Sequence, residues 1–142
     1  MLKNIPKIIS PELLKILSEM GHSDEIVIAD ANFPSESIGK RVIRADGISG
    51  CAMLSAVLKL IPLDTYADPN MILMRLSECD VGKINPVIWQ EYAKIAECDE
   101  NAKIGDIERF AFYERAKSAY AVIATGEEAV YANIILKKGV IN

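Results

Sequence analysis

The chain has 142 residues, the usual length of one domain, and we expect a single domain over residues 1–142. Hydrophobic residues make up 51% of the chain and charged residues 25%, a balance that excludes an intrinsically disordered protein. The formal net charge is -4 and the sequence has no block of Lys and Arg, which argues against a nucleic-acid partner.

A first helix is predicted directly after Ser10, and both of its ends are marked in the sequence. Ser10 is a typical N-cap residue, Pro11 suits the first helical position, and Glu12 places negative charge in the first turn. Gly21 is expected to end the helix in the left-handed conformation. The apolar residues between these ends repeat at helical spacing: Leu13, Leu14, Leu17 and Met20.

Short apolar runs and helical patterns alternate along the rest of the chain. The runs predicted as strands are 25–30, 42–43, 71–76, 120–124 and 133–136, and the helical patterns are 49–61, 86–98 and 110–118. This alternation predicts an α/β fold whose helices cover both faces of a sheet of about five or six strands. The loop between 124 and 133 is too short for a crossover helix, so we expect some antiparallel pairing in the sheet.

Neither a membrane span nor a disulfide framework is predicted. The longest apolar runs are far shorter than the ~20 residues that cross a bilayer. Residues 1–10 lack the apolar core and cleavage site of a signal peptide. Cys51, Cys79 and Cys98 are odd in number and widely spaced, which favours free thiols in the cytoplasm.

The only histidine, His22, lies between the first helix and the first strand. A lone histidine is commonly a surface or capping residue, but a loop held between two regular elements can also present it to a cleft. Asp30 ends the first strand, where α/β proteins bind ligands, although an aspartate leading into Asn32 can equally be a turn residue.

Three further positions carry polar groups that suit a neutral ligand. Arg109, at the start of a predicted helix, offers a forked donor, and its ordinary alternative is a surface ion pair with Glu108 or Asp106. Tyr131 and Asn133 supply neutral donors and acceptors of the kind that bind sugar hydroxyls, or are ordinary strand residues.

No cofactor or metal site is predicted. The sequence has no GxGxxG, no phosphate-binding GxxxxGK[ST] and no GxSxG nucleophile motif. The single histidine and the scattered cysteines lack zinc-ligand spacing. The remaining set of one histidine, carboxylates and an arginine suits acid–base chemistry on a neutral polar ligand.

Four stretches of the sequence together resemble the RbsD/FucU family of sugar mutarotases. They are LLKILSEMGHSDEIVIADANFP (13–34), RADG (44–47), ERFAFYERA (108–116) and YANIILKKGV (131–140). The third resembles the L-fucose branch of the family more than the D-ribose branch. The resemblance implies a three-layer αβα sandwich with a mixed central sheet.

The resemblance also implies an activity and a set of site residues. The activity is the interconversion of the α and β anomers of free L-fucose without a cofactor. The implied assembly is a ring, typically a decamer of two stacked pentamers, with the site near a subunit boundary. The resemblance assigns His22 as the catalytic acid–base residue and places the sugar against Asp30, Arg109 and the segment Tyr131, Ala132 and Asn133. Asn32 stands where fucose-branch relatives often have a histidine, so His22 has no second imidazole beside it.

Two alternatives remain open from the sequence. One is a mutarotase of the D-ribose type, and the other is a sugar-binding module without catalytic activity, since a fold by itself does not define a function. Measured anomer exchange on fucose and ribose distinguishes all three.

Overall fold

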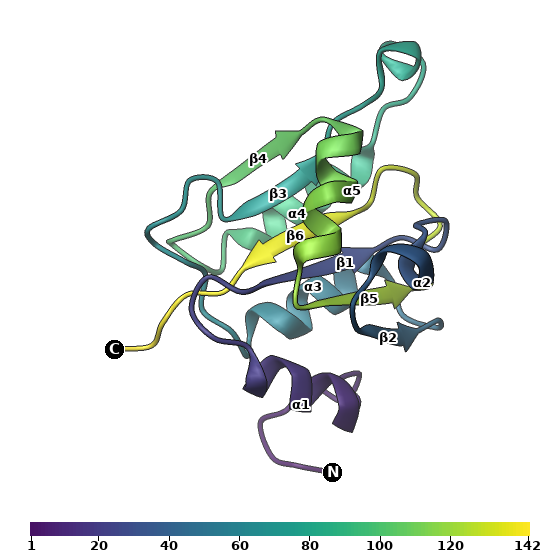
Figure 1. The fold of residues 1–142 in the computed structure, drawn as a ribbon. Coiled ribbons are helices and arrows are strands. Elements are labelled where there is room, and N and C mark those ends of the chain that lie inside the picture. Colours follow the sequence, from purple (N-terminus) through teal and green to yellow (C-terminus); the bar gives the residue numbers. More distant parts are fainter.

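The computed structural model describes all 142 residues and confirms the predicted layered α/β architecture (Figure 1). A single-turn 3-10 helix, η1, spans Glu78–Asp80. The α-helices are α1 (Pro11–Glu19), α2 (Ser35–Ile38), α3 (Gly50–Leu58), α4 (Val87–Ala96) and α5 (Arg109–Ser118). The strands are β1 (Glu25–Ala29), β2 (Val42–Ala45), β3 (Met71–Met74), β4 (Ile104–Ile107), β5 (Ala121–Thr125) and β6 (Ile134–Lys137).

The six strands form one mixed sheet in the order β2-β5-β1-β6-β3-β4. All neighbouring pairs are parallel except those of β6, which runs antiparallel to both β1 and β3. The expected antiparallel pairing is confirmed at β6, but β5 and β6 do not pair with each other, because β1 lies between them. Strands two positions apart are separated by about 10 Å, a distance that the loop between β5 and β6 spans easily.

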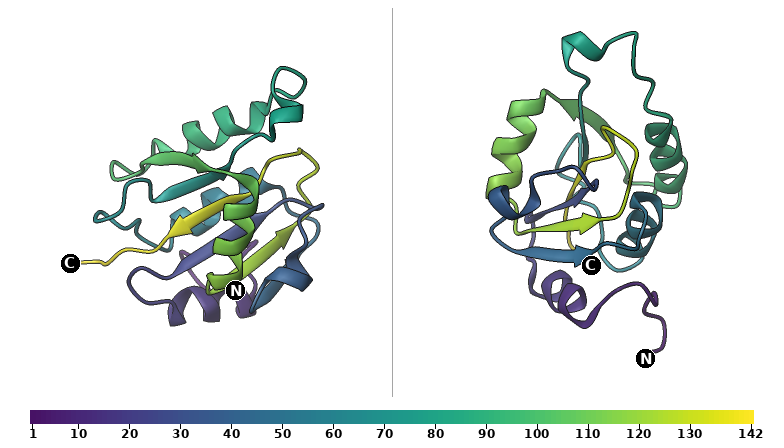
Figure 2. Two further views of the ribbon diagram at one scale, coloured as in Figure 1. Left: turned by 45° about the horizontal axis from the view of Figure 1, so that its top comes forward. Right: turned by 90° about the vertical axis from the view of Figure 1, so that its right-hand side faces the viewer.

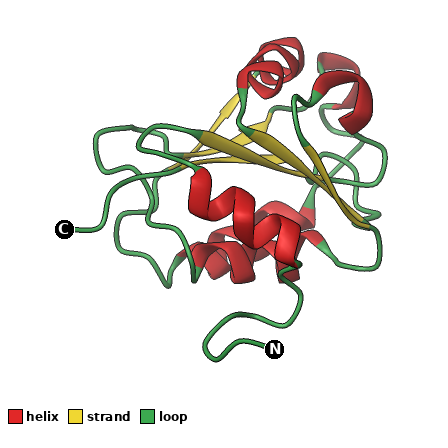
Figure 3. Ribbon diagram, turned by 60° about the horizontal axis from the view of Figure 1, so that its bottom comes forward, coloured by secondary structure: helices red, strands yellow, loops and turns green.

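Two hydrophobic cores lie on opposite faces of the sheet. Successive strand residues point to opposite faces, so Ile26 and Ile28 of β1 enter one core and Val27 and Ala29 enter the other. The first core is covered by α1, α3 and α4, and the second by α2 and α5, as Figure 3 shows from the edge of the sheet. The strands β3 and β5 are buried on both faces, which explains their continuous apolar sequences.

The helix α1 begins as predicted but ends differently. The Ser10 hydroxyl accepts the N–H of Leu13 at 3.1 Å. Gly21 does not adopt the left-handed conformation; Ser23 does so instead, with φ of 70°. The turn therefore comes two residues later, where the N–H of Ser23 donates to the carbonyl of Lys138 at 2.9 Å. This turn sets the position of His22.

Two elements have no clear signal in the sequence. The edge strand β4 alternates between exposed and half-buried residues and includes Gly105, which is unfavourable in strands. The helix α2 is a single turn inside the loop after Asp30. None of the helices is long and apolar enough to cross a membrane. A loop that carries η1 extends beyond the sheet, and both views in Figure 2 show it projecting.

Candidate active site

A pocket of about 250 Å³ opens at the edge of the sheet where β1 ends and β6 begins. This volume is slightly below the ~300 to 1,000 Å³ typical of drug-sized ligands, so the pocket suits a small molecule. Its polar lining comes from Asp30, Asn32, Arg109, Tyr113, Tyr131 and Asn133, and its apolar lining from Phe33, Met74 and Val130. Five of the six residues predicted from the sequence therefore lie at or beside one pocket, and His22 does not.

Asp30 and Asn133 form a reciprocal pair at the centre of the pocket. The strands β1 and β6 are antiparallel, so the residue after β1 meets the residue before β6. The N–H of Asp30 donates to Asn133 Oδ1 at 2.8 Å, and Asn133 Nδ2 donates to Asp30 Oδ2 at 3.0 Å. The N–H of Asn32 donates to Asp30 Oδ1 at 3.0 Å. These hydrogen bonds satisfy the polar groups of both buried side chains and fix their orientation.

The pKa of Asp30 lies above its ordinary value. Burial raises this pKa, and hydrogen bonds from Asn32, Ala132 and Asn133 offset the rise only in part. None of the groups that bind the carboxylate carries a positive charge. Asp30 therefore holds a proton more tightly than an exposed aspartate and can act as an acid or a base nearer neutral pH.

Side chains of α4 bind the backbone of Tyr131 and Ala132. Trp89 Nε1 donates to the carbonyl of Tyr131, and the Tyr92 hydroxyl donates to the carbonyl of Ala132, both at 2.8 Å. Tyr131 adopts the left-handed conformation, with φ of 59°. Ala132 is buried and contributes backbone only, so it shapes the segment and leaves the pocket surface to its neighbours.

The hydroxyl of Tyr131 is already engaged by the loop that carries η1. It donates to Asp80 Oδ2 at 2.5 Å and accepts the N–H of Ser77 at 3.3 Å. Both of these contacts orient the ring of Tyr131 as one wall of the pocket. The loop that projects from the sheet is in this way tied to the site.

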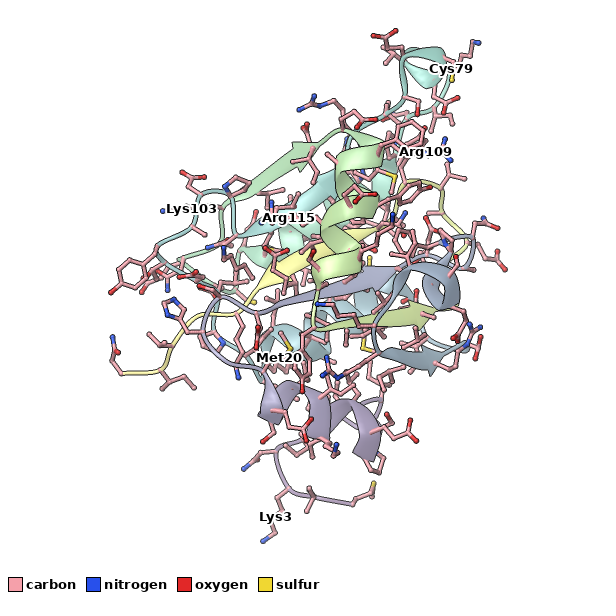
Figure 4. All side chains as sticks on the ribbon, in the orientation of Figure 1. Lys3, Met20, Cys79, Lys103, Arg109 and Arg115 are labelled. Carbon is pink, nitrogen blue, oxygen red and sulfur yellow. The ribbon has the colours of Figure 1, made fainter.

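Arg109 lies at the start of α5, on the rim of the pocket (Figure 4). Its Nε donates to the Tyr113 hydroxyl at 3.1 Å, a contact set by their spacing of four residues along the helix. This hydrogen bond raises the pKa of Arg109, which therefore stays protonated. The alternative of a surface ion pair is wrong, because Asp106 pairs with Arg75 and Glu108 caps α5.

His22 lies at the opposite end of the sheet from the pocket. It precedes β1 and Asp30 follows β1, so the length of this strand, about 16 Å at 3.3 Å per residue, separates them. Its Nε2 lies 3.2 Å from Asp64 Oδ1, and the Tyr66 ring lies 5.7 Å away. The His22 side chain is 42% exposed. Within one chain, His22 therefore cannot reach a ligand bound at Asp30.

Several residues of this region were missed by sequence reasoning. Tyr113 could have been found from its helical spacing to Arg109. Asp64, Asp80 and Trp89 act through contacts between segments that are 42 to 51 residues apart, and no local pattern signals such contacts. The structure brings together no cluster of three or more His, Cys, Asp or Glu side chains that could hold a metal ion.

Comparison with known proteins links this geometry to a family. Residues 3–141 match the model of the RbsD / FucU transport protein family. The chain is 52% identical to the fucose mutarotase of Danio rerio, over 99% of this chain and 94% of the relative. FucU from Bifidobacterium longum superposes with a TM-score of 0.94 at 55% identity, over 99% and 100% of the two chains. The Streptococcus pneumoniae fucose mutarotase in complex with L-fucose superposes with a TM-score of 0.92 at 49% identity and the same coverage.

Proposed function

The chain belongs to the RbsD/FucU family, and we propose that it is an L-fucose mutarotase, an isomerase that interconverts the α and β anomers of free L-fucose. One observation carries the proposal. The pocket joins the Asp30–Asn133 pair to Arg109, in a chain about half identical over nearly its whole length to proteins that bear this name. We assign this function to one domain over residues 1–142.

The lining of the pocket fits a free deoxy sugar. Asp30, Asn133 and Arg109 offer acceptors and donors for the hydroxyl groups of a neutral sugar. Phe33 and Met74 add an apolar wall on which a sugar methyl group or ring face can pack. We propose that Asp30, Arg109, Tyr131 and Asn133 contact the sugar, with Ala132 contributing backbone.

Mutarotation consists of ring opening, rotation of the carbonyl face and ring closure. Opening needs a proton on the ring oxygen and loss of one from the anomeric hydroxyl, and both transfers reverse on closure. We propose that His22 exchanges the proton at the reacting oxygens, since imidazole serves in both directions near neutral pH. Asp30, whose pKa is raised by burial, fixes a sugar hydroxyl and can take part in the second transfer.

His22 and the pocket lie at opposite ends of one chain, so we propose that a neighbouring subunit supplies the imidazole. Two exposed surfaces support this. Tyr66, 84% exposed, stands beside His22. Val130, 47% exposed, lines the pocket, and Phe110, 65% exposed, packs against Tyr113 of the pocket lining. A contact between two different surfaces closes into a ring when the rotation allows. We propose the decamer of two pentameric rings, located in the cytoplasm, where the three unpaired thiols remain reduced.

The activity is tested by saturation-transfer NMR on L-fucose and D-ribose with the purified protein. We expect the protein to accelerate exchange between fucose anomers above the spontaneous rate, and to act less on ribose. Binding of fucose without acceleration would identify a sugar-binding module. Faster exchange on ribose than on fucose would assign the protein to the ribose type.

The shared site is tested by mixing two inactive chains. His22→Ala and Asp30→Asn should each reduce exchange by ~10²-fold or more. When the two variants are co-expressed and assemble at random, about a quarter of the sites combine an intact His22 with an intact Asp30 from different chains. Recovered exchange, together with a light-scattering mass of ten 15.6 kDa chains, supports the proposal. Exchange that stays at the level of the separate variants would contradict it.

A further inference from the structure

A second buried carboxylate lies at the His22 end of the sheet. Asp64 is only 2% exposed, yet it belongs to a loop between α3 and β3. Its Oδ1 lies 3.2 Å from His22 Nε2 and accepts the N–H of Tyr66 at 3.0 Å. Its Oδ2 accepts the hydroxyl of Ser23 at 3.4 Å. Tyr66 and Ser23 therefore both donate to this carboxylate, and His22 is its third partner.

The loops that carry His22 and Asp64 are fastened to one short segment of backbone. The N–H of Ser23 donates to the carbonyl of Lys138, and the N–H of Asp64 donates to the carbonyl of Lys137 at 3.0 Å. Asn70 Nδ2 donates to the carbonyl of Asp64 at 3.0 Å. The end of β6 therefore holds the imidazole and the carboxylate in fixed relation, although they are 42 residues apart in sequence.

The chemistry of the pair determines which nitrogen of His22 carries hydrogen. Burial acts to raise the pKa of Asp64, but hydrogen bonds from Tyr66 and His22 more than offset it, so the pKa lies below its ordinary value. An ionised carboxylate only accepts hydrogen bonds. His22 Nε2 must therefore donate to Asp64, which leaves Nδ1 as the basic nitrogen, on the side of the ring away from the carboxylate.

We propose that Asp64 is a positioning residue that holds the His22 imidazole in the Nε2–H tautomer and presents Nδ1 to the reacting oxygen of the sugar. The inference rests on the proposed function, because it assigns a role within that reaction. The Tyr66 ring, tilted by 51° to the imidazole, limits its rotation from one side. Asp64 itself touches no substrate.

A double-mutant cycle tests the proposal by anomer exchange. Asp64→Asn should lower the exchange rate at saturating fucose by about tenfold or more and leave KM nearly unchanged, because the pocket at Asp30 is intact. In the His22→Ala background the same substitution should have no further effect on exchange. Asp99→Asn is the matched control, since Asp99 makes the same turn with Asn101 but faces no histidine. This control should retain full exchange.

A second experiment measures the tautomer of His22 directly, by NMR of its imidazole nitrogens. His22 is the only histidine of the chain, so ¹⁵N spectra of the imidazole are assigned at once. We expect the neutral imidazole of the wild type to carry its hydrogen on Nε2 and none on Nδ1, and the neutral imidazole of Asp64→Asn to be a mixture of tautomers. The proposal is overturned if Nδ1 carries the hydrogen, or if Asp64→Asn retains full exchange while His22→Ala has lost it. A wild-type protein that does not accelerate exchange at all would instead overturn the proposed function.

Discussion

The two buried carboxylates of this protein, Asp30 and Asp64, lie at opposite ends of the sheet and differ in their partners. Asp30 is bound by backbone N–H groups and the neutral amide of Asn133, and its pKa is raised. Asp64 accepts the backbone N–H of Tyr66 and the hydroxyl of Ser23, it also faces His22, and its pKa is lowered. Both side chains are almost inaccessible to solvent, but burial dominates the pKa of Asp30, whereas hydrogen bonds from Tyr66 and His22 outweigh burial at Asp64.

This difference separates two tasks that one carboxylate cannot perform together. A carboxylate whose pKa is raised holds a proton more tightly and can exchange it with a sugar hydroxyl. A carboxylate that stays ionised can instead orient an imidazole and stabilise its charged form. In the proposed ring assembly, the Asp30 end of one sheet meets the His22 end of the neighbouring sheet. Each site then combines Asp30 of one chain with the His22–Asp64 pair of the next.

The largest effect is expected from exchanging the partners of the Asp30 pair. Asp30→Asn places two amide donors against each other, so we expect a loss of ~10²-fold or more in anomer exchange and about 1–3 kcal/mol in unfolding free energy. The double variant Asp30→Asn with Asn133→Asp restores a donor and an acceptor at the same place. It should recover most of the unfolding free energy, measured by urea denaturation, but not the exchange rate. Recovery of both quantities would mean that the position of the carboxylate is immaterial.

Arg109 is expected to show an effect about one order of magnitude smaller. Arg109→Lys removes the forked donor and the hydrogen bond to Tyr113, while it keeps the positive charge at the rim. We expect KM for fucose to rise by roughly tenfold, with a smaller change in kcat, as one hydrogen bond to a charged group is lost. Arg41→Lys is the control, because Arg41 lies 4.1 Å over the Tyr120 ring, outside the pocket lining. Equal effects of the two substitutions on KM would mean that Arg109 does not bind the sugar.

The pocket was predictable from the sequence to the extent that it is built at the ends of regular elements. Asp30 ends an apolar strand, Asn133 begins one, and Arg109 starts a helix, so local patterns indicate where each lies. Their convergence depends on β6 lying beside β1, and the short loop between β5 and β6 does not indicate that arrangement. A short loop limits the distance between two strands but does not determine which strand lies between them.

The His22–Asp64 pair was not predictable, for a related reason. Asp64 lies in a loop whose position depends on hydrogen bonds to Lys137 and on the contact of Asn70 with its carbonyl. No periodicity or capping signal marks these contacts in the sequence. The sequence predicted the importance of His22 by resemblance, whereas its orientation follows only from the three-dimensional structure.

A smaller effect is expected at Tyr131, whose hydroxyl contacts protein groups. Tyr131→Phe removes the hydrogen bonds to Asp80 and Ser77 but keeps the ring that forms the pocket wall. We expect KM for fucose to rise about fivefold, the equivalent of one neutral hydrogen bond of ~1 kcal/mol. Tyr120→Phe, which removes a hydroxyl bound to Glu19, is the control and should leave KM unchanged. A large fall in kcat for Tyr131→Phe would instead mean that this hydroxyl takes part in the proton transfer.

The smallest expected effect is a difference in how the unfolding free energy of two variants depends on pH. It tests the comparison of the two carboxylates directly. The ordinary value for both is 3.8, and the pKa of Asp30 in the folded protein lies above it. The folded state therefore binds the Asp30 proton more tightly, so the contribution of Asp30 to stability is greatest below pH 3.8 and is lost as pH rises through its folded pKa. The pKa of Asp64 is lowered, so its contribution is present above pH 3.8 and is lost as pH falls through its folded pKa.

Urea denaturation between pH 3 and pH 7 should therefore give opposite trends for two matched variants. From the acid end to neutral pH, the cost of Asp30→Asn should decrease, because the wild type loses stability as Asp30 ionises. Over the same range the cost of Asp64→Asn should increase, because the wild type gains stability as Asp64 ionises. Asp99→Asn is the reference, because Asp99 accepts the N–H of Asn101 in the same way but faces no histidine. If both costs changed in the same direction, the partners of the two carboxylates would not determine their proton affinities, and His22 would have no special relation to Asp64.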